Sequence, residues 1–282
     1  MSEQRTAAVL AGLVLLAGAA ACNGGGAGAP GAAPGSASGG SARSASGPTA
    51  SASASASAEP ENGAAALPAR EIVERSVGAL RTAGSVRITG RGSSQGQSVT
   101  FDLSTDTSGT CAGTMGLSGQ GTFRLVKLGT ELWVKPDAVF WRSHGGAAAE
   151  DLVGEKYLKT TTDNTDFSQI GDVCDLDALG GALLEQTPDS LAVGGPATVD
   201  GTPAVTVSGT ADDGTSTLTV ATRGEPYPLR MEKAGGEETG RVELKEFGVP
   251  VEAEAPSPAE TLDLDLLNSD SGDPTDPATM SL

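Results

Sequence analysis

The sequence predicts an α+β fold in which one amphipathic helix precedes a long antiparallel β-sheet. Apolar residues recur at helical spacing early in the central part of the chain, between residues 69 and 82. Short segments of alternating apolar and polar residues follow, separated by glycine-rich turns, which is typical of an antiparallel meander. This central part holds about 180 residues, enough for one domain with a hydrophobic core.

The N-terminus has the features of an export signal that ends in a lipid-attachment site. One cation, Arg5, precedes an uncharged apolar run over residues 6–21, which is too short to span a bilayer and fits the hydrophobic region of a signal peptide. The run ends in three alanines and Cys22, a pattern that resembles a bacterial lipobox. The resemblance implies a signal peptide over residues 1–21 and a lipid on Cys22, including acyl groups such as palmitate. An ordinary signal peptide with an incidental cysteine is the alternative.

Two segments that flank the central part are not expected to fold. From residue 22 to 66 the chain is mostly Ala, Gly, Ser and Pro without a hydrophobic period, so we expect a disordered tether, either bare or glycosylated on its Ser-Ala repeats. From residue 252 to 282 it carries eight acidic residues and no lysine or arginine, and we expect a mobile acidic tail whose leucines could dock locally. The folded domain is therefore predicted to span residues 67–251.

The acidic balance of the chain limits its partners. The formal net charge is −18, of which the tail supplies −8. Such a charge argues against binding to nucleic acid and against electrostatic adhesion to anionic lipid. Attachment to a membrane must therefore come from the lipid on the N-terminus.

The folded part begins with a helix and a first group of strands. The stripe of Ile72, Val73, Val77 and Leu80 predicts an amphipathic helix over residues 69–82, and Gly84 is expected to end it. Alternating segments then predict strands over residues 85–91, 97–105, 113–118, 122–128 and 131–135. The last two are expected to form a hairpin around residues 129–130, and a short apolar segment follows at residues 139–141.

A helical interlude and a second group of strands complete the domain. We expect a short helix over residues 147–153 and a longer one, capped by Asp166, whose apolar stripe runs from Phe167 to Leu183. Strands resume near Leu191 and continue to residue 244, with turns expected at residues 200–201, 213–214 and 235–236.

Three cysteines are present, and Cys22 is assigned to the anchor. The remaining pair, Cys111 and Cys174, is even in number in an exported chain, which predicts one disulfide between the third strand and the interlude helix. Two buried free thiols are the alternative.

The order of these segments, together with three turn motifs, resembles a known family. The motifs are VDGTPA at residues 199–204, EPYPLR at residues 225–230 and EFGVP at residues 246–250. With the lipobox, tether and leading helix they resemble the LppX/LprG-type lipoproteins of high-GC Gram-positive bacteria, which share the LolA/LolB-like half-barrel. The resemblance covers about residues 68–251 and implies a strongly curved sheet whose concave face is covered by helices. It also implies a hydrophobic cavity between them for the acyl chains of lipids or lipoglycans.

The strand pattern itself predicts one continuous apolar face of the sheet. The candidate cavity residues on this face are Val86, Ile88, Val99, Phe101, Leu103, Met115, Leu117, Val205, Val207, Leu218, Val220, Leu229 and Met231. Packing of these side chains against the helices as an ordinary core is the alternative, because a cavity requires apolar area beyond what the helices cover.

Signals for catalysis and metal binding are weak. Residues 92–96 match the nucleophile-elbow pattern around Ser94, but a strand follows instead of a helix, so we expect Ser94 at a hairpin tip. The single histidine, His144, is expected in a surface loop, and no cysteine or histidine cluster has zinc spacing. We therefore expect neither an enzyme nor a metal or cofactor site.

Two hypotheses about function follow. The first is a monomeric binding protein, anchored by its lipid to the outer face of the cell membrane, that holds or carries acyl-chain ligands. The second is an envelope protein-interaction or sensing module on the same fold, whose protein partner the sequence does not identify. A continuous void would favour the first, and a filled interior would favour the second.

Overall fold

The computed structural model describes residues 59–94, 96–144, 150–151, 153–164, 167–185, 188, 190–264 and 266. The predicted signal peptide, Cys22 and the tether as far as residue 58 lie outside these residues. So do Asp166, most of the short helix expected over residues 147–153, and the chain from residue 267 onward. The end of the predicted tether is part of the fold instead, because Glu61 pairs with Arg223 in a β-bridge and Ala64 is buried.

The described residues fold around one twelve-stranded sheet with the order β12-β6-β5-β4-β3-β2-β1-β11-β10-β9-β8-β7. The strands are β1 (Ser85–Ser94), β2 (Gln97–Asp106), β3 (Cys111–Leu117), β4 (Gly121–Leu128), β5 (Glu131–Pro136), β6 (Tyr157–Thr161), β7 (Leu191–Val199), β8 (Thr202–Ala211), β9 (Gly214–Ala221), β10 (Pro228–Ala234), β11 (Glu238–Lys245) and β12 (Thr261–Asp263). The helices are α2 (Ala69–Thr82), α3 (Ala138–His144), α5 (Ser168–Val173) and α6 (Leu176–Glu185), with short 3-10 turns η1 (Ala64–Ala66) and η2 (Pro258–Glu260).

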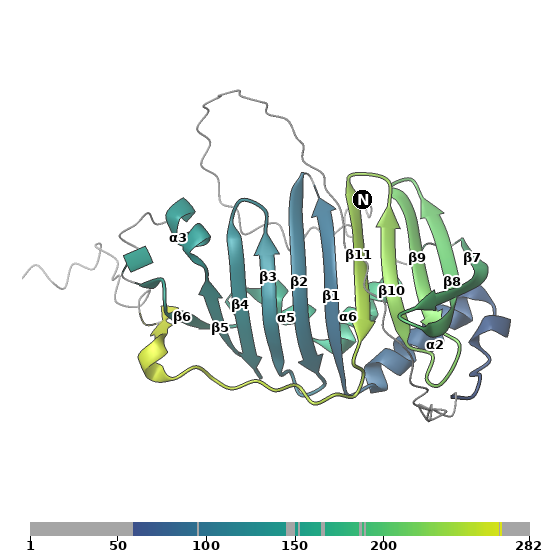
Figure 1. The fold of residues 1–282 in the computed structure, drawn as a ribbon, viewed down its shortest axis with the longest axis horizontal. Coiled ribbons are helices and arrows are strands. Elements are labelled where there is room, and N and C mark those ends of the chain that lie inside the picture. The colour runs from purple at the N-terminus through teal and green to yellow at the C-terminus, as the bar shows by residue number, and fades with distance from the viewer. Residues whose placement is uncertain are drawn as a thin grey trace, which may run out of the picture. The chain divides into compact units, whose positions relative to one another are not determined.

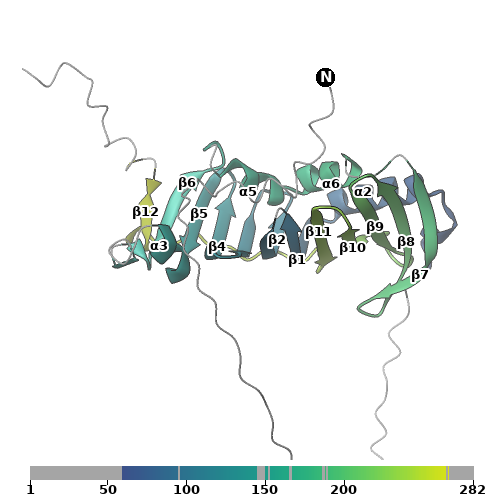
Figure 2. The same ribbon diagram turned by 90° about the horizontal axis from the view of Figure 1, so that it is seen from above.

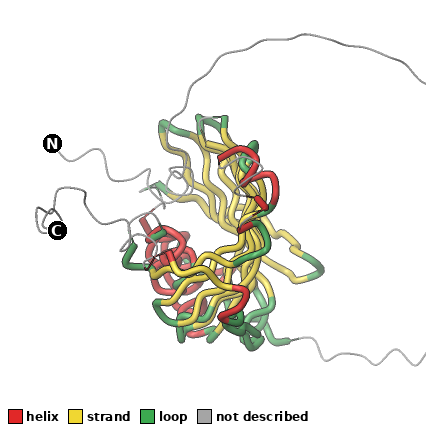
Figure 3. Tube along the Cα trace, turned by 90° about the vertical axis from the view of Figure 1, so that its left-hand side faces the viewer, coloured by secondary structure: helices red, strands yellow, loops and turns green. Residues whose placement is uncertain are grey.

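The sheet is curved and does not close, because β7 and β12 each have a neighbour on one side only. Antiparallel pairing of β1 with β11 at its centre joins the first group of strands to the second, as Figure 1 shows. The strands form one layer (Figure 3), and α2, α5 and α6 lie on the same side of it (Figure 2). We call this helix-covered side the inner face and the opposite side the open face. The predicted fold class is confirmed.

Helix α2 begins and ends at the predicted residues. Its stripe of Ile72, Val73, Val77 and Leu80 is buried against the sheet. The ion pair between Arg75 and Glu71 lies on the exposed side at i,i+4 spacing. Gly84 follows with φ +80°, a left-handed conformation that favours glycine and terminates the helix.

The predicted strands are confirmed, with small shifts at their ends. The turn at Asp200-Gly201 has positive φ at both residues, as a type I′ hairpin requires. The next turn lies one residue earlier than predicted, because Ala211 pairs directly with Gly214, which makes Gly214 the first residue of β9. A Cβ added at Gly214 would lie 2.6 Å from the Ala234 carbonyl oxygen and collide with it. Glycine at this position therefore allows β9 to approach the end of β10 closely.

The interlude differs from the prediction in three respects. The single helix expected from Phe167 to Leu183 is two helices, because the backbone breaks at Cys174 and the Asp175 carboxylate accepts hydrogen bonds from the amides of Asp177 and Ala178 to begin α6. The short apolar segment at residues 139–141 is part of α3, whose first turn is capped by Asp137. Strand β6 was not predicted, although its residues 157–161 include Tyr157 and two threonines, which favour strands.

The beginning of the expected acidic tail is part of the fold. The chain crosses the end of the sheet after Val249, which accepts a hydrogen bond from Ser85 through its carbonyl oxygen. Residues Thr261–Asp263 then pair in parallel with Tyr157–Lys159 of β6. The domain boundary predicted at residue 251 is therefore too early, because alternation around Leu262 allows a short edge strand despite the acidic composition.

The core is divided into clusters on the inner face. One joins Ile170 of α5 to Leu103, Leu125 and Leu132 of the first strands. A second joins Ile72 and Val73 of α2 to β8 and β9, and a third joins Leu80 of α2 and Leu176 of α6 to β1 and β11. Helix α5 thus covers the first strands, α2 and α6 share the rest of the inner face, and the clusters border a cavity under α6.

Candidate ligand cavity

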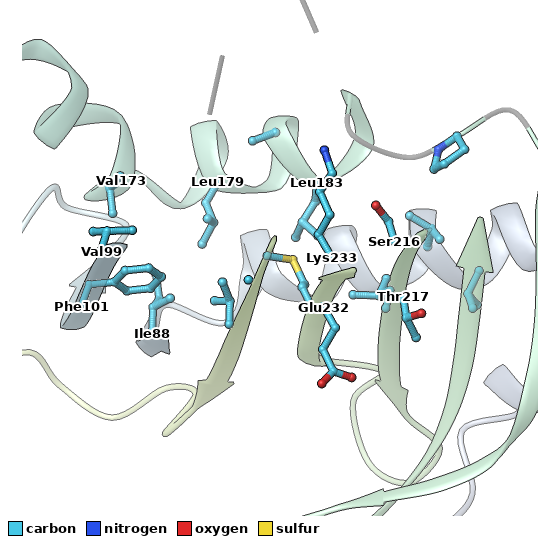
Figure 4. Close-up of a pocket in the computed structure, with 18 of the residues that line it drawn as sticks. Ile88, Val99, Phe101, Val173, Leu179, Leu183, Ser216, Thr217, Glu232 and Lys233 are labelled. Carbon is cyan, nitrogen blue, oxygen red and sulfur yellow. The ribbon is translucent and has the colours of Figure 1, made fainter. Parts of the chain in front are cut away.

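An apolar cavity of about 150 Å³ lies between the inner face of the sheet and α6 (Figure 4). Its floor comes from strands that are distant in sequence, and its roof comes from Val173 at the end of α5 and from α6. The lining residues are Val73, Ile88, Val99, Phe101, Leu103, Met115, Val173, Leu179, Ala182, Leu183, Pro188, Leu191, Val207, Ser216, Thr217, Leu218, Met231, Glu232, Lys233, Gly240 and Val242.

Most of the predicted cavity residues lie on the inner face, and eight of them line the cavity. These eight are Ile88, Val99, Phe101, Leu103, Met115, Val207, Leu218 and Met231. Four others share the face but lie outside the lining. Val86 packs with Leu80, while Val205 and Val220 pack with Ile72. Leu117 is buried at the end of β3.

Leu229 was wrongly assigned to the cavity. The register between β9 and β10 shifts between Pro228 and Arg230, so Leu229 is an extra residue in the ladder. Its side chain packs with Ala204, Ala221 and Tyr227 in a cluster on the open face. Simple alternation places Leu229 and Met231 on the same face, and the bulge breaks that alternation.

Glycines on the inner face bring no side chain into the centre of the sheet. Gly92 pairs with Gly240 across β1 and β11, so neither residue fills the position with a side chain. Gly90, one step along β1, lies under Phe101, whose ring atoms would be 2.6 Å from a Cβ at that position. The ring therefore occupies the volume above Gly90, and Gly240, which has no side chain, lines the cavity with it.

The roof of the cavity is held at its beginning by a disulfide. Cys111 on β3 and Cys174 between α5 and α6 are bonded, with their Cα atoms 5.6 Å apart, and both are fully buried. The Thr105 hydroxyl donates a hydrogen bond of 3.0 Å to the carbonyl oxygen of Cys174. The predicted disulfide is confirmed, and it fixes the start of α6 to the first group of strands.

In its middle, α6 packs against α2. A Cβ at Gly180 would lie 3.2 Å from Val77 and 3.1 Å from the Arg81 side chain, so the two helices approach closely at this glycine. Leu179, Ala182 and Leu183 of α6 line the cavity. The close approach of α6 to α2 thus depends on a small residue in the middle of α6.

A polar rim, which we did not predict, lies at one end of the apolar cavity. Lys233 and Ser216 are paired across β9 and β10 and both line the cavity. Figure 4 shows the Lys233 amine and the Ser216 hydroxyl on the helix side, whereas the Glu232 carboxylate points away. A lysine in the inward register of a strand, two residues after Met231, is the sequence signal that could have identified this rim.

Lys233 is held by two carboxylates. Its amine lies 2.5 Å from Asp213 and 3.4 Å from Glu238. Partial burial acts to lower the pKa of Lys233, but the hydrogen bond and charge of Asp213, helped by Glu238, outweigh it and raise the pKa above the ordinary value. The same hydrogen bond lowers the pKa of Asp213. The rim is therefore an ionised cluster at neutral pH.

The residues considered for catalysis are not arranged as a catalytic site. Ser94 is the last residue of β1, as predicted for a hairpin tip, and its hydroxyl lies 3.4 Å from Glu238. His144 ends α3, where its ring stacks on Phe140 at 4.3 Å and its Nδ1 lies 3.0 Å from the Phe140 carbonyl oxygen. Within the described residues, no group of three or more His, Cys, Asp or Glu side chains could hold a metal ion.

A second hollow, of about 470 Å³, lies on the open face beneath residues 249–252. Although it is larger, its walls include the charged side chains of Arg87, Glu246 and Glu252. Arg87 is already bonded to Asp102 at 2.8 Å and to Glu246 at 3.0 Å. Charged walls are unfavourable for an apolar ligand, so the cavity under α6 is the candidate site.

Searches for similar proteins found structures but no sequence relatives. No family model matches the chain, and no curated protein matches it. Among solved structures, the chain is similar to LprF from Mycobacterium bovis, at 15% identity over 67% of this chain and 97% of that chain, with a TM-score of 0.49. It is also similar to the Mycobacterium tuberculosis lipoprotein LppX, at 13% identity over 66% and 98%, with a TM-score of 0.47.

A further similar structure is the MucA/MucB complex of Pseudomonas aeruginosa, at 16% identity over 68% of this chain and 62% of that chain, with a TM-score of 0.34. LprF and LppX are lipoproteins of the kind that the sequence motifs resemble. In the part of the chain that the structure describes, no helix is both long enough and apolar enough to cross a membrane.

Proposed function

We propose that this protein is a lipid-anchored, extracytoplasmic binding protein that holds an acyl chain in the cavity under α6. The observation that carries the proposal is the cavity itself, which is apolar, lies between sheet and helices, and is partly open. A filled interior would have favoured the interaction module. Binding makes and breaks no covalent bond, so the protein acts without catalysis.

The size of the cavity determines how a chain can enter. An apolar cavity of about 150 Å³ has room for a group the size of benzene. A long acyl chain therefore needs more space, which displacement of α6 from the sheet would supply. The start of α6 is fixed by the disulfide, whereas Leu183 and Leu184 hold its far end by apolar packing, so we expect that end to be the part that moves.

Burial of the chain supplies the driving force. Each methylene removed from water contributes about 0.8 kcal/mol, so insertion of a few carbons offsets the loss of contacts between α6 and its neighbours. The polar rim at Lys233 and Ser216 leaves the headgroup in a polar environment while the chain is buried. A ligand with one apolar and one polar end matches both parts of the site.

The anchor and the tether place this site outside the cell membrane in the proposal. Two or more acyl groups on Cys22 would attach the protein stably. Because Glu61 and Ala64 already belong to the fold, the remaining tether of about 36 residues would hold the domain within roughly 30–36 Å of the anchor on average. The net charge of the chain, −18, opposes adhesion to anionic lipid.

Organic extraction tests the proposal. The full chain carries Cys22→Ala, which removes the covalent lipid, and is purified from the organism that naturally produces it. Native mass spectrometry is then recorded before and after organic extraction. We expect a mass shift that disappears on extraction and acyl lipids in the extract. A protein with no extractable lipid, which also fails to take up a fluorescent monoacylglycerol, would refute the proposal.

A further inference from the structure

The charges of the polar rim bear on which headgroup the cavity accepts. Among the residues that line the cavity, Lys233 and Glu232 are the charged ones, and Glu232 points to the open face. The side chain of Lys233 is only 17% exposed, so its methylenes lie along the cavity wall and its amine reaches the rim. A single lysine at this place would attract an anionic headgroup.

The positive charge of Lys233, however, is outweighed by two carboxylates. Asp213 and Glu238 both pair with it, so the three groups together carry one negative charge. Glu238 cannot easily turn away, because its side chain is only 18% exposed and is also in contact with Ser94. Asp213 sits on a turn and its side chain is 66% exposed, so it is the more movable of the two.

From this arrangement we propose that Glu238 and Asp213 make the cavity selective for ligands with an uncharged, hydroxyl-bearing headgroup over ligands with an anionic one. The inference rests on the proposed acyl-chain function. A carboxylate or phosphate at the rim meets a net negative cluster in a partly desolvated place, where charge repulsion is weakly screened. A hydroxyl-bearing headgroup donates hydrogen bonds to the same carboxylates and exchanges them with the Ser216 hydroxyl.

A matched pair of ligands tests the selectivity. Monopalmitoylglycerol and palmitate carry the same chain and differ in headgroup charge, and their affinities for the full chain with Cys22→Ala can be measured by titration calorimetry at pH 8. We expect monopalmitoylglycerol to bind at least tenfold more tightly. The difference should shrink in high salt, as expected for a charge effect at a partly exposed rim.

Glu238→Gln removes the partly buried carboxylate. It is expected to raise the affinity for palmitate about tenfold and to change that for monopalmitoylglycerol less than threefold. Glu237→Gln is the control, because Glu237 is the adjacent, exposed residue and its loss changes the net charge by the same amount. Thermal unfolding establishes that each variant folds, and Asp213→Asn, on an exposed turn, replaces Glu238→Gln if that variant does not.

The outcomes separate the two proposals. Palmitate binding as tightly as monopalmitoylglycerol to the wild-type domain overturns the selectivity and leaves the acyl-chain function intact. The selectivity is also overturned if Glu238→Gln and Glu237→Gln behave alike. Failure of both ligands to bind overturns the proposed function, and the selectivity with it.

Discussion

Filling the cavity from its roof should abolish acyl-chain binding without unfolding the protein. Ala182 of α6 is half-buried and lines the cavity, so Ala182→Leu adds three carbons to the void. An empty cavity of about 150 Å³ costs about 3–4 kcal/mol at roughly 24 cal/mol per Å³. Three buried carbons recover at most about 2.4 kcal/mol of transfer free energy. We therefore expect the free energy of unfolding to rise by about 1–2 kcal/mol, measured by urea denaturation.

Ala178→Leu is the matched control for this substitution. Ala178 lies one turn earlier on α6, is exposed, and is absent from the cavity lining, so the helix-propensity change is the same and no void is filled. Its free energy of unfolding should change by less than about 0.5 kcal/mol, and uptake of a fluorescent monoacylglycerol should persist.

The reasoning about the cavity would be wrong if Ala182→Leu behaved as an overpacked core substitution. In that event stability would fall by about 1–3 kcal/mol, because the added carbons would displace side chains that already touch. A stable Ala182→Leu protein that still takes up the monoacylglycerol at the wild-type level would equally contradict the assignment, since the ligand would then bind elsewhere.

Three other predictions concern the anchor, the disulfide and acid stability. Cys22→Ala should move the protein from the membrane fraction to the soluble fraction or leave it unprocessed, and continued incorporation of labelled fatty acid would exclude Cys22 as the lipidated residue. Reduction of the Cys111–Cys174 bond, which closes a loop with a sequence separation of 63, should lower the free energy of unfolding by about 4 kcal/mol, and a peptide map without reductant should show the two peptides joined. The hydrogen bond from Arg87 lowers the pKa of Asp102, so this carboxylate contributes stability above the unfolded aspartate pKa of about 3.9 that is lost as the pH falls through its folded value. Asp102→Asn should therefore destabilise the domain at pH 7 and have little effect at a pH well below that range, and an equal effect at both would contradict the pairing.

Local patterns predicted most of the secondary structure. The helix over residues 69–82 has the bounds expected from its stripe of apolar residues, because periodicity and a terminating glycine act within one segment. The Asp200-Gly201 turn was predictable for the same reason, since positive φ at two adjacent positions is a property of those residues themselves. The break at Asp175 was missed because an unbroken apolar stripe obscured a helix-capping residue.

The candidate site was only partly predictable. Alternation identified the inner face and eight of the lining residues, but it misplaced Leu229, because a bulge is a relation between two strands and leaves little trace in either one alone. The rim around Lys233 was missed for a similar reason. Its two carboxylates come from a turn and a strand on either side of β10, and register brings them together.

By itself the sequence determined the order of helices and strands, the apolar face of the sheet and the pairing of Cys111 with Cys174, because each depends on residue type and spacing along one segment or on the presence of a single pair. Only the tertiary structure decided that β1 pairs with β11, that Leu229 faces away, and that a void remains beneath α6. A void is the difference between the volume that the backbone encloses and the volume that side chains from distant segments fill. The cavity is lined by strands from both groups, which meet where β1 pairs with β11, and no local pattern encodes that meeting.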